Sequence, residues 1–384
     1  MSGTSKTVLY ASVGADIAQY DVDVANCTLV PRGTVSGPAN VQYVWPHASR
    51  QFLYSASSDG ASGMGAAGNN HHVTAFRIDP VSGALSPHGA PIPLPARPIH
   101  MATDIPSQHV LVAFNNPPAI RVYRVNQDGT PGAEVMQPGP IDPGIFPHQV
   151  LATPDGRQVI LVARGFDASK DTPEQPGALQ VFDFADGVLS NQVSVAPQGG
   201  YGFGPRHLDF HPTQPWVYVS LERQAEVAFF TLTDGRFSSD ALARESTLLA
   251  GAPPGPHQPV GTVHVHPNGR FVYVANRASD RVDGKFAGGQ NSMAVFAIDP
   301  ASGKPSVIQH NDTQGIHPRT FHIDPSGRMM VVAHIMGMSM PDGSEMPTRL
   351  TTFRIGDDGK LTFVKAYDIE TGGRLMWWAG MVTL

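Results

Sequence analysis

His266-Pro-Asn-Gly-Arg-Phe-Val-Tyr-Val-Ala-Asn276 is the stretch that decides the fold. A Pro-Asn-Gly-Arg turn is followed at once by β-branched and aromatic residues, which is the composition of a short strand after a tight turn. A second clear copy spans Asp324 to His334, and weaker copies span residues 153–164 and 211–222. Repetition of one turn-and-strand unit predicts a repeat protein.

The length of the unit follows from its turn prolines, which lie 48 to 60 residues apart. They are Pro46, Pro106, Pro154, Pro212, Pro267 and Pro325. A third apolar strand recurs in every unit, beginning at Ile17, Val73, Ile120, Leu179, Val227, Met293 and Leu350. These third strands, together with an N-terminal strand over 8–13, predict seven units.

A period of this size with three or four short strands per unit predicts an all-β, seven-bladed β-propeller that occupies residues 1–384 as one domain. No helical pattern of about ten to fifteen residues separates the strands, which argues against a parallel α/β fold. A β-helix would have much shorter repeats. Residues 6–13 and 375–384 both have strand composition, so we expect the two chain ends to pair in one blade and close the ring.

The composition agrees with this fold and limits the function. Of 384 residues, 40 are glycine, 35 are proline and 15% are charged, which favours many short strands joined by turns. The formal net charge is −6 and no block of Lys and Arg occurs, so we expect neither nucleic acid nor a membrane as a partner. The absence of a signal sequence and the single Cys27 predict a cytoplasmic protein.

Alignment of the units on the turn proline predicts two sets of residues at one end of adjacent strands. Six residues before the proline stand Asn40, His100, His148, Arg206, Gly261 and Arg319. Ten residues after it stand Asn116, Arg164, Glu222, Arg277 and Ile335, with His334 one step earlier, while the first copy gives Ala56 and Ser57. A single charge there is usually only solvated. The whole set favours an anion-binding cavity with an acid/base group, because arginine offers a fixed fork for carboxylate, phosphate or an oxyanion.

The 16 histidines raise the question of a metal site. A divalent ion would need three or four of them to converge. The pairs His264 with His266 and Asp209 with His211 fall within innermost strands, where a hydrogen bond to the backbone of a neighbouring blade is the favoured role. We therefore predict no metal and no cofactor.

Two loops interrupt the regular unit, residues 57–70 and residues 336–347. Both follow a second strand, which favours a place on the rim of the site. A role as ordinary mobile surface loops is about equally compatible with either sequence taken alone.

Three fragments resemble one known family: Gly-Pro-Arg-His-Leu-x-Phe-His-Pro from Gly204, Tyr-Val-x-x-Glu from Tyr218, and Val-His-x-x-Gly-Arg-Phe-Val-Tyr-Val-Ala-Asn-Arg from Val265. They are similar to the seven-bladed propeller lactonases, which include bacterial 6-phosphogluconolactonases and the fungal carboxy-muconate lactonising enzyme. The resemblance implies a catalytic set of His148, Arg206, Glu222 and Arg277. A histidine at 334 departs from it, since many relatives would have Asn there.

We accordingly expect a lactonase that opens a small anionic sugar lactone such as 6-phosphoglucono-δ-lactone. The substrate-binding residues expected are Asn40, His100, Asn116, Arg164, Arg319 and His334. Of these, Arg164 and Arg319 are the candidates to bind a phosphate or carboxylate of the substrate. The chain lacks a Gly-x-Ser-x-Gly elbow, so no acyl-enzyme is expected. A δ- to γ-lactone isomerase, a muconate-type cycloisomerase and a non-catalytic binding propeller stay open, as does the choice between monomer and dimer.

Overall fold

The computed structural model describes residues 6–63 and 65–384, and antiparallel sheets make up most of it. Within these residues the helical structure is limited to a 3₁₀ turn, Pro197–Gly200. No helix in the described part of the chain is long and apolar enough to span a membrane. The chain divides into two compact units. Unit 1 comprises the described residues up to Asp21, Pro31–Pro205 and Val382–Leu384, and unit 2 comprises Val22–Val30 and Arg206–Met381.

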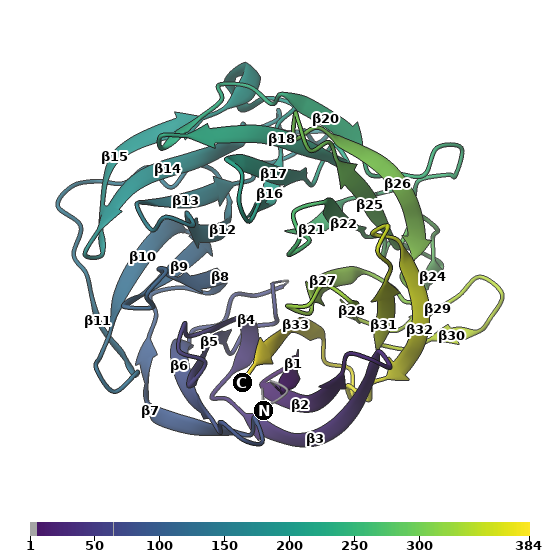
Figure 1. Cartoon of the computed structure of the whole chain (residues 1–384), viewed down its shortest axis with the longest axis horizontal. Coiled ribbons are helices and arrows are strands. Elements are labelled where there is room, and N and C mark those ends of the chain that lie inside the picture. Colours follow the sequence, from purple (N-terminus) through teal and green to yellow (C-terminus); the bar gives the residue numbers. More distant parts are fainter. Residues whose placement is uncertain (1–5, 64) are drawn as a thin grey trace. The chain divides into compact units, whose positions relative to one another are not determined.

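Unit 1 contains three sheets of four strands in chain order, drawn from purple to teal in Figure 1. The first has β4 (Asn40–Pro46), β5 (Phe52–Ser58), β6 (His71–Ile78) and β7 (Leu85–Pro93). The second has β8 (Pro98–Thr103), β9 (His109–Asn115), β10 (Pro118–Val125) and β11 (Pro131–Glu134). The third has β12 (Pro147–Ala152), β13 (Gln158–Ala163), β14 (Ala178–Ala185) and β15 (Val188–Val195).

Unit 2 repeats the same arrangement three times. Its first sheet has β16 (Pro205–Phe210), β17 (Trp216–Leu221), β18 (Glu226–Thr233), β19 (Arg236–Phe237) and β20 (Ala243–Ser246). The second has β21 (Val260–Val265), β22 (Phe271–Asn276), β25 (Ser292–Ile298) and β26 (Pro305–Asp312). The third has β27 (Pro318–Ile323), β28 (Met329–His334), β31 (Arg349–Ile355) and β32 (Leu361–Asp368).

A seventh sheet joins the two ends of the chain in the order β3-β2-β1-β33. Its strands are β1 (Thr7–Val13), β2 (Asp16–Asp23), β3 (Thr28–Ser36) and β33 (Met376–Thr383). The backbone N–H of Leu384 donates to the carbonyl of Lys6 over 2.9 Å, and the hydroxyls of Thr7 and Thr383 lie 3.3 Å apart. Seven sheets and the pairing of the chain ends confirm the repeat count and the closure predicted from the sequence.

Apolar cores lie between successive sheets within each unit. In unit 1, for example, Tyr54 and Val73 of one sheet pack with Val112 and Phe114 of the next. Every second residue of a strand points to the same face. Second strands such as β5, β9 and β13 are buried along their whole length, whereas outer strands such as β7 are largely exposed. Burial of these faces is the main stabilising contribution to the fold.

A buried tyrosine hydroxyl links each of four second strands to the following sheet. Tyr54 donates to the carbonyl of Gly129 over 2.9 Å, and Tyr218 donates to that of Gly303 over 2.8 Å. Tyr10 and Tyr273 make the same bond. Burial raises the pKa of all four phenols. The tyrosine recurring in this strand of the repeat therefore supplies a donor to a turn carbonyl in the next sheet.

Tyr218→Phe is expected to lower the free energy of unfolding by about 1 to 3 kcal/mol, because the carbonyl of Gly303 loses a buried donor. Urea unfolding followed by tryptophan fluorescence measures the change. The matched control is Tyr201→Phe, since Tyr201 is 53% exposed and should tolerate the loss of its hydroxyl. Equal stability of Tyr218→Phe and the unaltered protein would contradict the prediction.

Two of the histidines predicted within innermost strands, His211 and His266, stand directly after those strands at the start of the turn, and they have the structural role predicted for them. The ring Nε2 of His211 lies 2.8 Å from the carbonyl oxygen of Gly269, and that of His266 lies 2.8 Å from the carbonyl oxygen of Gly327. Both carbonyls belong to turns of the following sheet. The prediction that these histidines bond the backbone of a neighbouring blade is confirmed.

Candidate active site

A buried carboxylate shared by two arginines is the centre of the candidate site in unit 2. Arg206 lies in β16, Glu222 directly follows β17, and Arg277 directly follows β22. The Nε of Arg206 lies 3.1 Å from Oε1 of Glu222, and Nη2 of Arg277 donates to the same oxygen. Only 1% of Arg206, 6% of Glu222 and 4% of Arg277 is exposed. Three charges at such burial require mutual pairing, since an isolated buried charge costs several kcal/mol.

The Arg277 guanidinium is held from several sides. Its Nη2 also donates to the carbonyl of Val260 over 2.8 Å. Gly261 stands at the first-strand position that holds His148, Arg206 and Arg319 in three other sheets. It lies beneath the Arg277 side chain, and a Cβ there would be 3.0 Å from Cδ of Arg277. The glycine therefore leaves the space through which the arginine reaches Glu222.

His317 is a member of this cluster that the sequence did not point to. Its Nε2 lies 3.1 Å from Nη1 of Arg277, and its Nδ1 lies 2.9 Å from the hydroxyl of Ser279. Burial, and then the positive charges of Arg277, Arg319 and Arg206, hold the pKa of His317 well below its usual range, while Glu222 acts weakly in the other direction. The imidazole is therefore neutral near pH 7.

Alignment on the turn proline missed His317 because it examined Arg319, two residues further on. His317 stands just before Pro318 with φ of 56°, and Phe146 stands just before Pro147 with φ of 55°. The two residues thus share a left-handed conformation at the same place, directly before the proline that begins the first strand of a sheet. A search for the X-Pro-(His/Arg) pattern would have found His317.

Arg319 lies above an indole ring. Its Cζ is 3.6 Å from the ring centre of Trp377, which is the geometry of a cation–π contact. The ring N–H of Trp377 is buried and has no hydrogen-bond partner among residues 6–63 and 65–384. Trp377 is itself buried in β33, so its ring is a fixed support for Arg319.

The candidates in unit 1 occupy corresponding strand ends. His148 lies in β12 at a β-bulge, because Pro147 pairs with Ala163 while Gln149 pairs with the adjacent Val162. Its side chain is buried. Arg164 follows β13, and its Cζ lies 4.6 Å from the ring centre of Phe146 and 6.0 Å from that of Phe166. Bulges commonly direct one side chain toward a site at the end of a sheet.

In two sheets of unit 1, alignment on the turn proline assigned the site positions to the wrong residues of the strands. The turn of the third sheet starts at Thr153, whose N–H bonds the carbonyl of Gln158. The corresponding bonds start the other two turns at His47 and Asp104, so Pro46 precedes its turn and Pro106 stands one place late. Counted from the turn itself, the first-strand positions are Gln42 and Ile99 instead of Asn40 and His100. The second-strand positions are Ser58 and Asn115 instead of Ala56–Ser57 and Asn116.

A shift of one residue along a strand turns a side chain to the opposite face. His100 accordingly packs on Tyr43, with ring centres 3.8 Å apart, and its Nδ1 accepts from the N–H of Val150 over 3.4 Å. Asn40 donates to the carbonyl of Gly60 over 3.1 Å. Asn116 is exposed in the turn between β9 and β10. Their substrate-binding roles remain predictions, but these residues do not occupy the places equivalent to His148 and Arg164.

His334 is completely buried, and its ring packs against Gly315. Its Nδ1 lies 3.1 Å from the carbonyl oxygen of Arg349. Its place in β28 matches that of Asn276 in β22, whose amide bonds Thr247 and Ser292. Desolvation lowers the pKa of His334 to about 4. These contacts stabilise the sheet, and the predicted contact with substrate stays a prediction.

The depressed pKa of His334 predicts how stability depends on pH. The histidine of the unfolded chain has its ordinary pKa of about 6.5, whereas His334 in the folded chain has a pKa of about 4. Between these two pH values the unfolded chain binds a proton that the folded chain does not bind, so the free energy of unfolding falls as the pH is lowered from 6.5 to 4. The contribution is about 2 kcal/mol between pH 6.5 and pH 5. Urea unfolding of the unaltered protein and of His334→Asn at several pH values should give curves that converge as the pH falls. Parallel curves would contradict this assignment.

Both interrupting loops have defined structure near strand ends. In the loop 57–70, described apart from residue 64, the N–H of Gly63 donates to Gln42 over 2.8 Å and Arg97 donates to the carbonyls of Ala61 and Gly65. Loop 336–347 contains a hairpin of β29 (Met338–Ser339) and β30 (Glu345–Met346). This hairpin contacts β24 (Lys285–Phe286), the partner of β23 (Arg281–Val282) (Figure 1). A role on the rim of the site remains a prediction.

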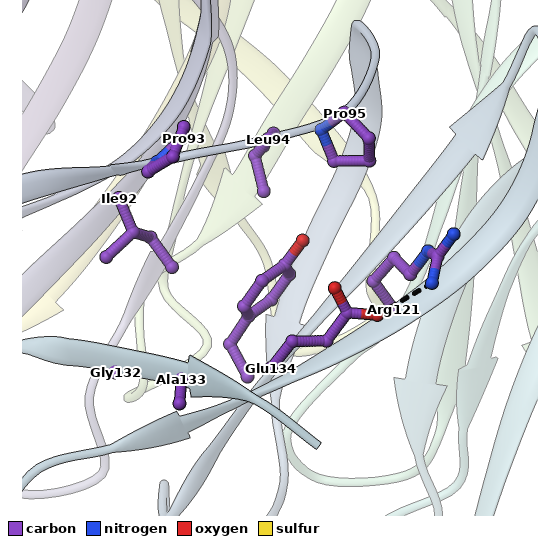
Figure 2. Close-up of a pocket in the computed structure, with 9 residues that line it drawn as sticks. Ile92, Pro93, Leu94, Pro95, Arg121, Gly132, Ala133 and Glu134 are labelled. Atoms are coloured by element: carbon purple, nitrogen blue, oxygen red, sulfur yellow. Dashed lines mark hydrogen bonds and ion pairs between the residues drawn. The ribbon is translucent and has the colours of Figure 1, made fainter. Parts of the chain in front are cut away.

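A hollow of about 640 Å³ lies elsewhere in unit 1, between Ile92–Pro95 and strands β10 and β11. Figure 2 shows apolar side chains on one side and the Arg121–Glu134 ion pair at its edge. The two partners are 42% and 29% exposed, so this pair is a surface salt bridge of little energetic weight. The hollow contains none of the predicted site residues.

Across residues 6–63 and 65–384, no three His, Cys, Asp or Glu side chains are grouped closely enough to hold a metal ion. His264, for which the sequence favoured a bond to the backbone of a neighbouring blade, instead has its Nδ1 3.2 Å from the Asp209 carboxylate.

Comparison with known proteins identifies the class. The family model described as lactonase, 7-bladed beta-propeller, matches residues 3–338, so the chain belongs to this family of seven-bladed β-propellers. This confirms the predicted resemblance and fold.

Individual relatives are similar over most of their length. The 6-phosphogluconolactonase of Bacillus subtilis is 29% identical over 339 residues, which cover 85% of this chain and 86% of the relative. The 6-phosphogluconolactonase of Cronobacter sakazakii is 26% identical, over 79% of this chain and 82% of the relative. The solved structure of the periplasmic gluconolactonase of Pseudomonas aeruginosa has a TM-score of 0.71 at 21% identity, covering 96% of this chain and 97% of that one, and shows a shared fold.

Proposed function

We propose that this protein hydrolyses the lactone of an anionic sugar acid, with 6-phosphoglucono-δ-lactone as the first candidate. The observation that carries the proposal is the Glu222 carboxylate buried between the guanidinium groups of Arg206 and Arg277. The names of the relatives support the reaction class.

Charge favours an anionic substrate. Arg206, Arg277 and Arg319 together with Glu222 carry two more positive than negative charges, and all four side chains are buried. His317 adds no charge, because its pKa is depressed by burial and by the arginines. A bound phosphate or carboxylate would compensate the excess, and arginine binds either group through paired N–H donors. Arg319, supported by Trp377, is our candidate for that role, as is Arg164 in unit 1.

The proposed reaction needs one proton acceptor and a set of fixed donors. A water oxygen attacks the lactone carbonyl carbon while Glu222 takes the water proton. The carbonyl oxygen becomes an oxyanion, which the N–H groups of Arg206 and Arg277 stabilise. Collapse of the intermediate breaks the ring C–O bond, and the proton held by Glu222 passes to the leaving oxygen, which becomes a hydroxyl of the open-chain acid. His148, in unit 1, stays the predicted second acid/base group.

Time-resolved carbon NMR of the purified protein with freshly generated 6-phosphoglucono-δ-lactone tests the proposal. Faster formation of the open acid than in buffer alone supports a lactonase, and a run with chelator tests the predicted independence from metal. A transient γ-lactone ahead of the acid would instead identify an isomerase. Absence of acceleration with phosphorylated, aldonic and aldaric lactones would reject lactone hydrolysis and leave cyclisation of muconates or binding without turnover.

Binding of the reaction product can be measured separately from turnover. Calorimetry with 6-phosphogluconate, the product, measures binding without turnover. Arg319→Met should weaken this binding about tenfold to a hundredfold, which corresponds to loss of one charge-assisted contact of about 1.5 to 3 kcal/mol. Equal affinity in Arg319→Met and the unaltered protein would remove Arg319 from the proposed phosphate or carboxylate site.

A further inference from the structure

The contact between Arg277 and His317 fixes which ring nitrogen carries the proton. Arginine can only donate, so the Nε2 of His317, 3.1 Å from Nη1 of Arg277, must be the acceptor. A neutral imidazole then carries its proton on Nδ1, which donates to the hydroxyl oxygen of Ser279 over 2.9 Å. This assignment is the Nδ1–H tautomer.

The same assignment excludes a serine nucleophile at this place. A Ser–His pair of that kind needs the serine hydroxyl to donate to a ring nitrogen with a free lone pair. Here Nδ1 carries the proton and the lone pair of Nε2 already accepts from Arg277. Ser279 therefore serves as an acceptor that fixes the histidine.

The groups around the ring keep it neutral. Arg277, Arg319 and Arg206 all oppose a positive charge on His317, and Glu222 is the carboxylate that favours one. The N–H of His317 donates to the side chain of Asn291 over 2.9 Å, which anchors the backbone at this left-handed residue. Protonation would remove the acceptor and place a second positive charge 3.1 Å from the Arg277 guanidinium.

We propose that His317 is a positioning residue: its Nε2 holds the Arg277 guanidinium in the orientation in which Nη2 reaches Glu222, and Ser279 fixes the tautomer that makes this possible. The inference rests on the proposed lactone hydrolysis for its consequence in rate. Nη1 of Arg277 bonds the histidine while Nη2 bonds Glu222 and the carbonyl of Val260, so the plane of the guanidinium is defined at both ends. Misplacement of a reacting group by about 1 Å can cost a hundredfold in rate.

Two substitutions of His317 distinguish the loss of its hydrogen bonds from the loss of its side-chain volume. Glutamine at 317 offers an oxygen that accepts from Arg277 and an amide that donates to Ser279, whereas leucine offers neither. His317→Leu should lower kcat about tenfold to a hundredfold with little change in KM, and His317→Gln should restore most of it. In an Arg277→Lys background, His317→Leu should have almost no further effect, because the group it positions is already gone. Additive losses, or equal losses in His317→Leu and His317→Gln, would overturn the proposal.

A spectroscopic readout does not depend on turnover. Nitrogen NMR of histidine-labelled protein should show a neutral Nδ1–H ring whose signals are lost in His317→Gln and shifted in Ser279→Ala. The Nδ1–H ring of His334, which donates to the carbonyl of Arg349, should be present in both variants. Slowly exchanging guanidinium protons of Arg277 should persist in His317→Gln and vanish in His317→Leu. Loss of an Nε2–H ring instead of an Nδ1–H ring in His317→Gln, or unchanged guanidinium exchange in His317→Leu, would overturn the proposal even in a protein that hydrolyses no lactone. A protein with these signals and no lactonase activity would contradict the proposed function alone.

Discussion

Replacement of Glu222 by Gln is expected to lower kcat for lactone hydrolysis about a hundredfold to ten-thousandfold. The amide keeps the volume of the side chain and one oxygen for Arg206 and Arg277, but it cannot take a proton from water. It also removes the one negative charge of the buried cluster, so Arg206 and Arg277 lose the charge that fixes them. Steady-state rates with 6-phosphoglucono-δ-lactone, corrected for the spontaneous reaction, measure the effect.

Two further variants make this result interpretable. Glu226→Gln removes a carboxylate from a partly exposed pair with Arg244 and should leave both rate and stability nearly unchanged. Glu222→Ala leaves two buried guanidinium groups without their shared acceptor and should cost about 3 to 5 kcal/mol of stability. If Glu222→Gln stays folded by circular dichroism and retains full turnover, Glu222 is not the base.

Arg277→Lys is expected to lower kcat about a hundredfold to a thousandfold, the usual effect of losing one donor to an oxyanion. The substitution preserves the positive charge. A single ammonium cannot, however, bond Glu222, the carbonyl of Val260 and His317 in the fixed plane of a guanidinium. The expected loss is therefore in geometry, and it should appear in kcat more than in KM.

Arg281→Lys is the matched control for this experiment. Arg281 is exposed in the β23 hairpin only four residues away, and its replacement should change neither kcat nor KM appreciably. Activity of Arg277→Lys close to that of Arg281→Lys would show that charge alone suffices. The oxyanion would then need another donor, and Arg206→Lys would be the next variant to measure.

Sequence periodicity was enough to predict the seven sheets and the pairing of the chain ends. It also placed Arg206, Glu222 and Arg277 at equivalent strand ends, and the structure brings these three together. The prediction worked there because the turn proline holds one place in the turn that follows β12, β16, β21 and β27. It failed in the first two sheets of unit 1, where Pro46 and Pro106 stand elsewhere in their turns.

The sequence by itself determined the repeat, its strands and the chemistry available at their ends, because alternation and turn residues act over a few neighbours. Only the tertiary structure decided which of those side chains touch. His317 joins Arg277 across 40 residues through a left-handed residue before a proline, and His334 turns instead to a backbone carbonyl. Which side chains make contact depends on strand register and on the distance between atoms in different sheets, and neither can be predicted from neighbouring residues in the sequence.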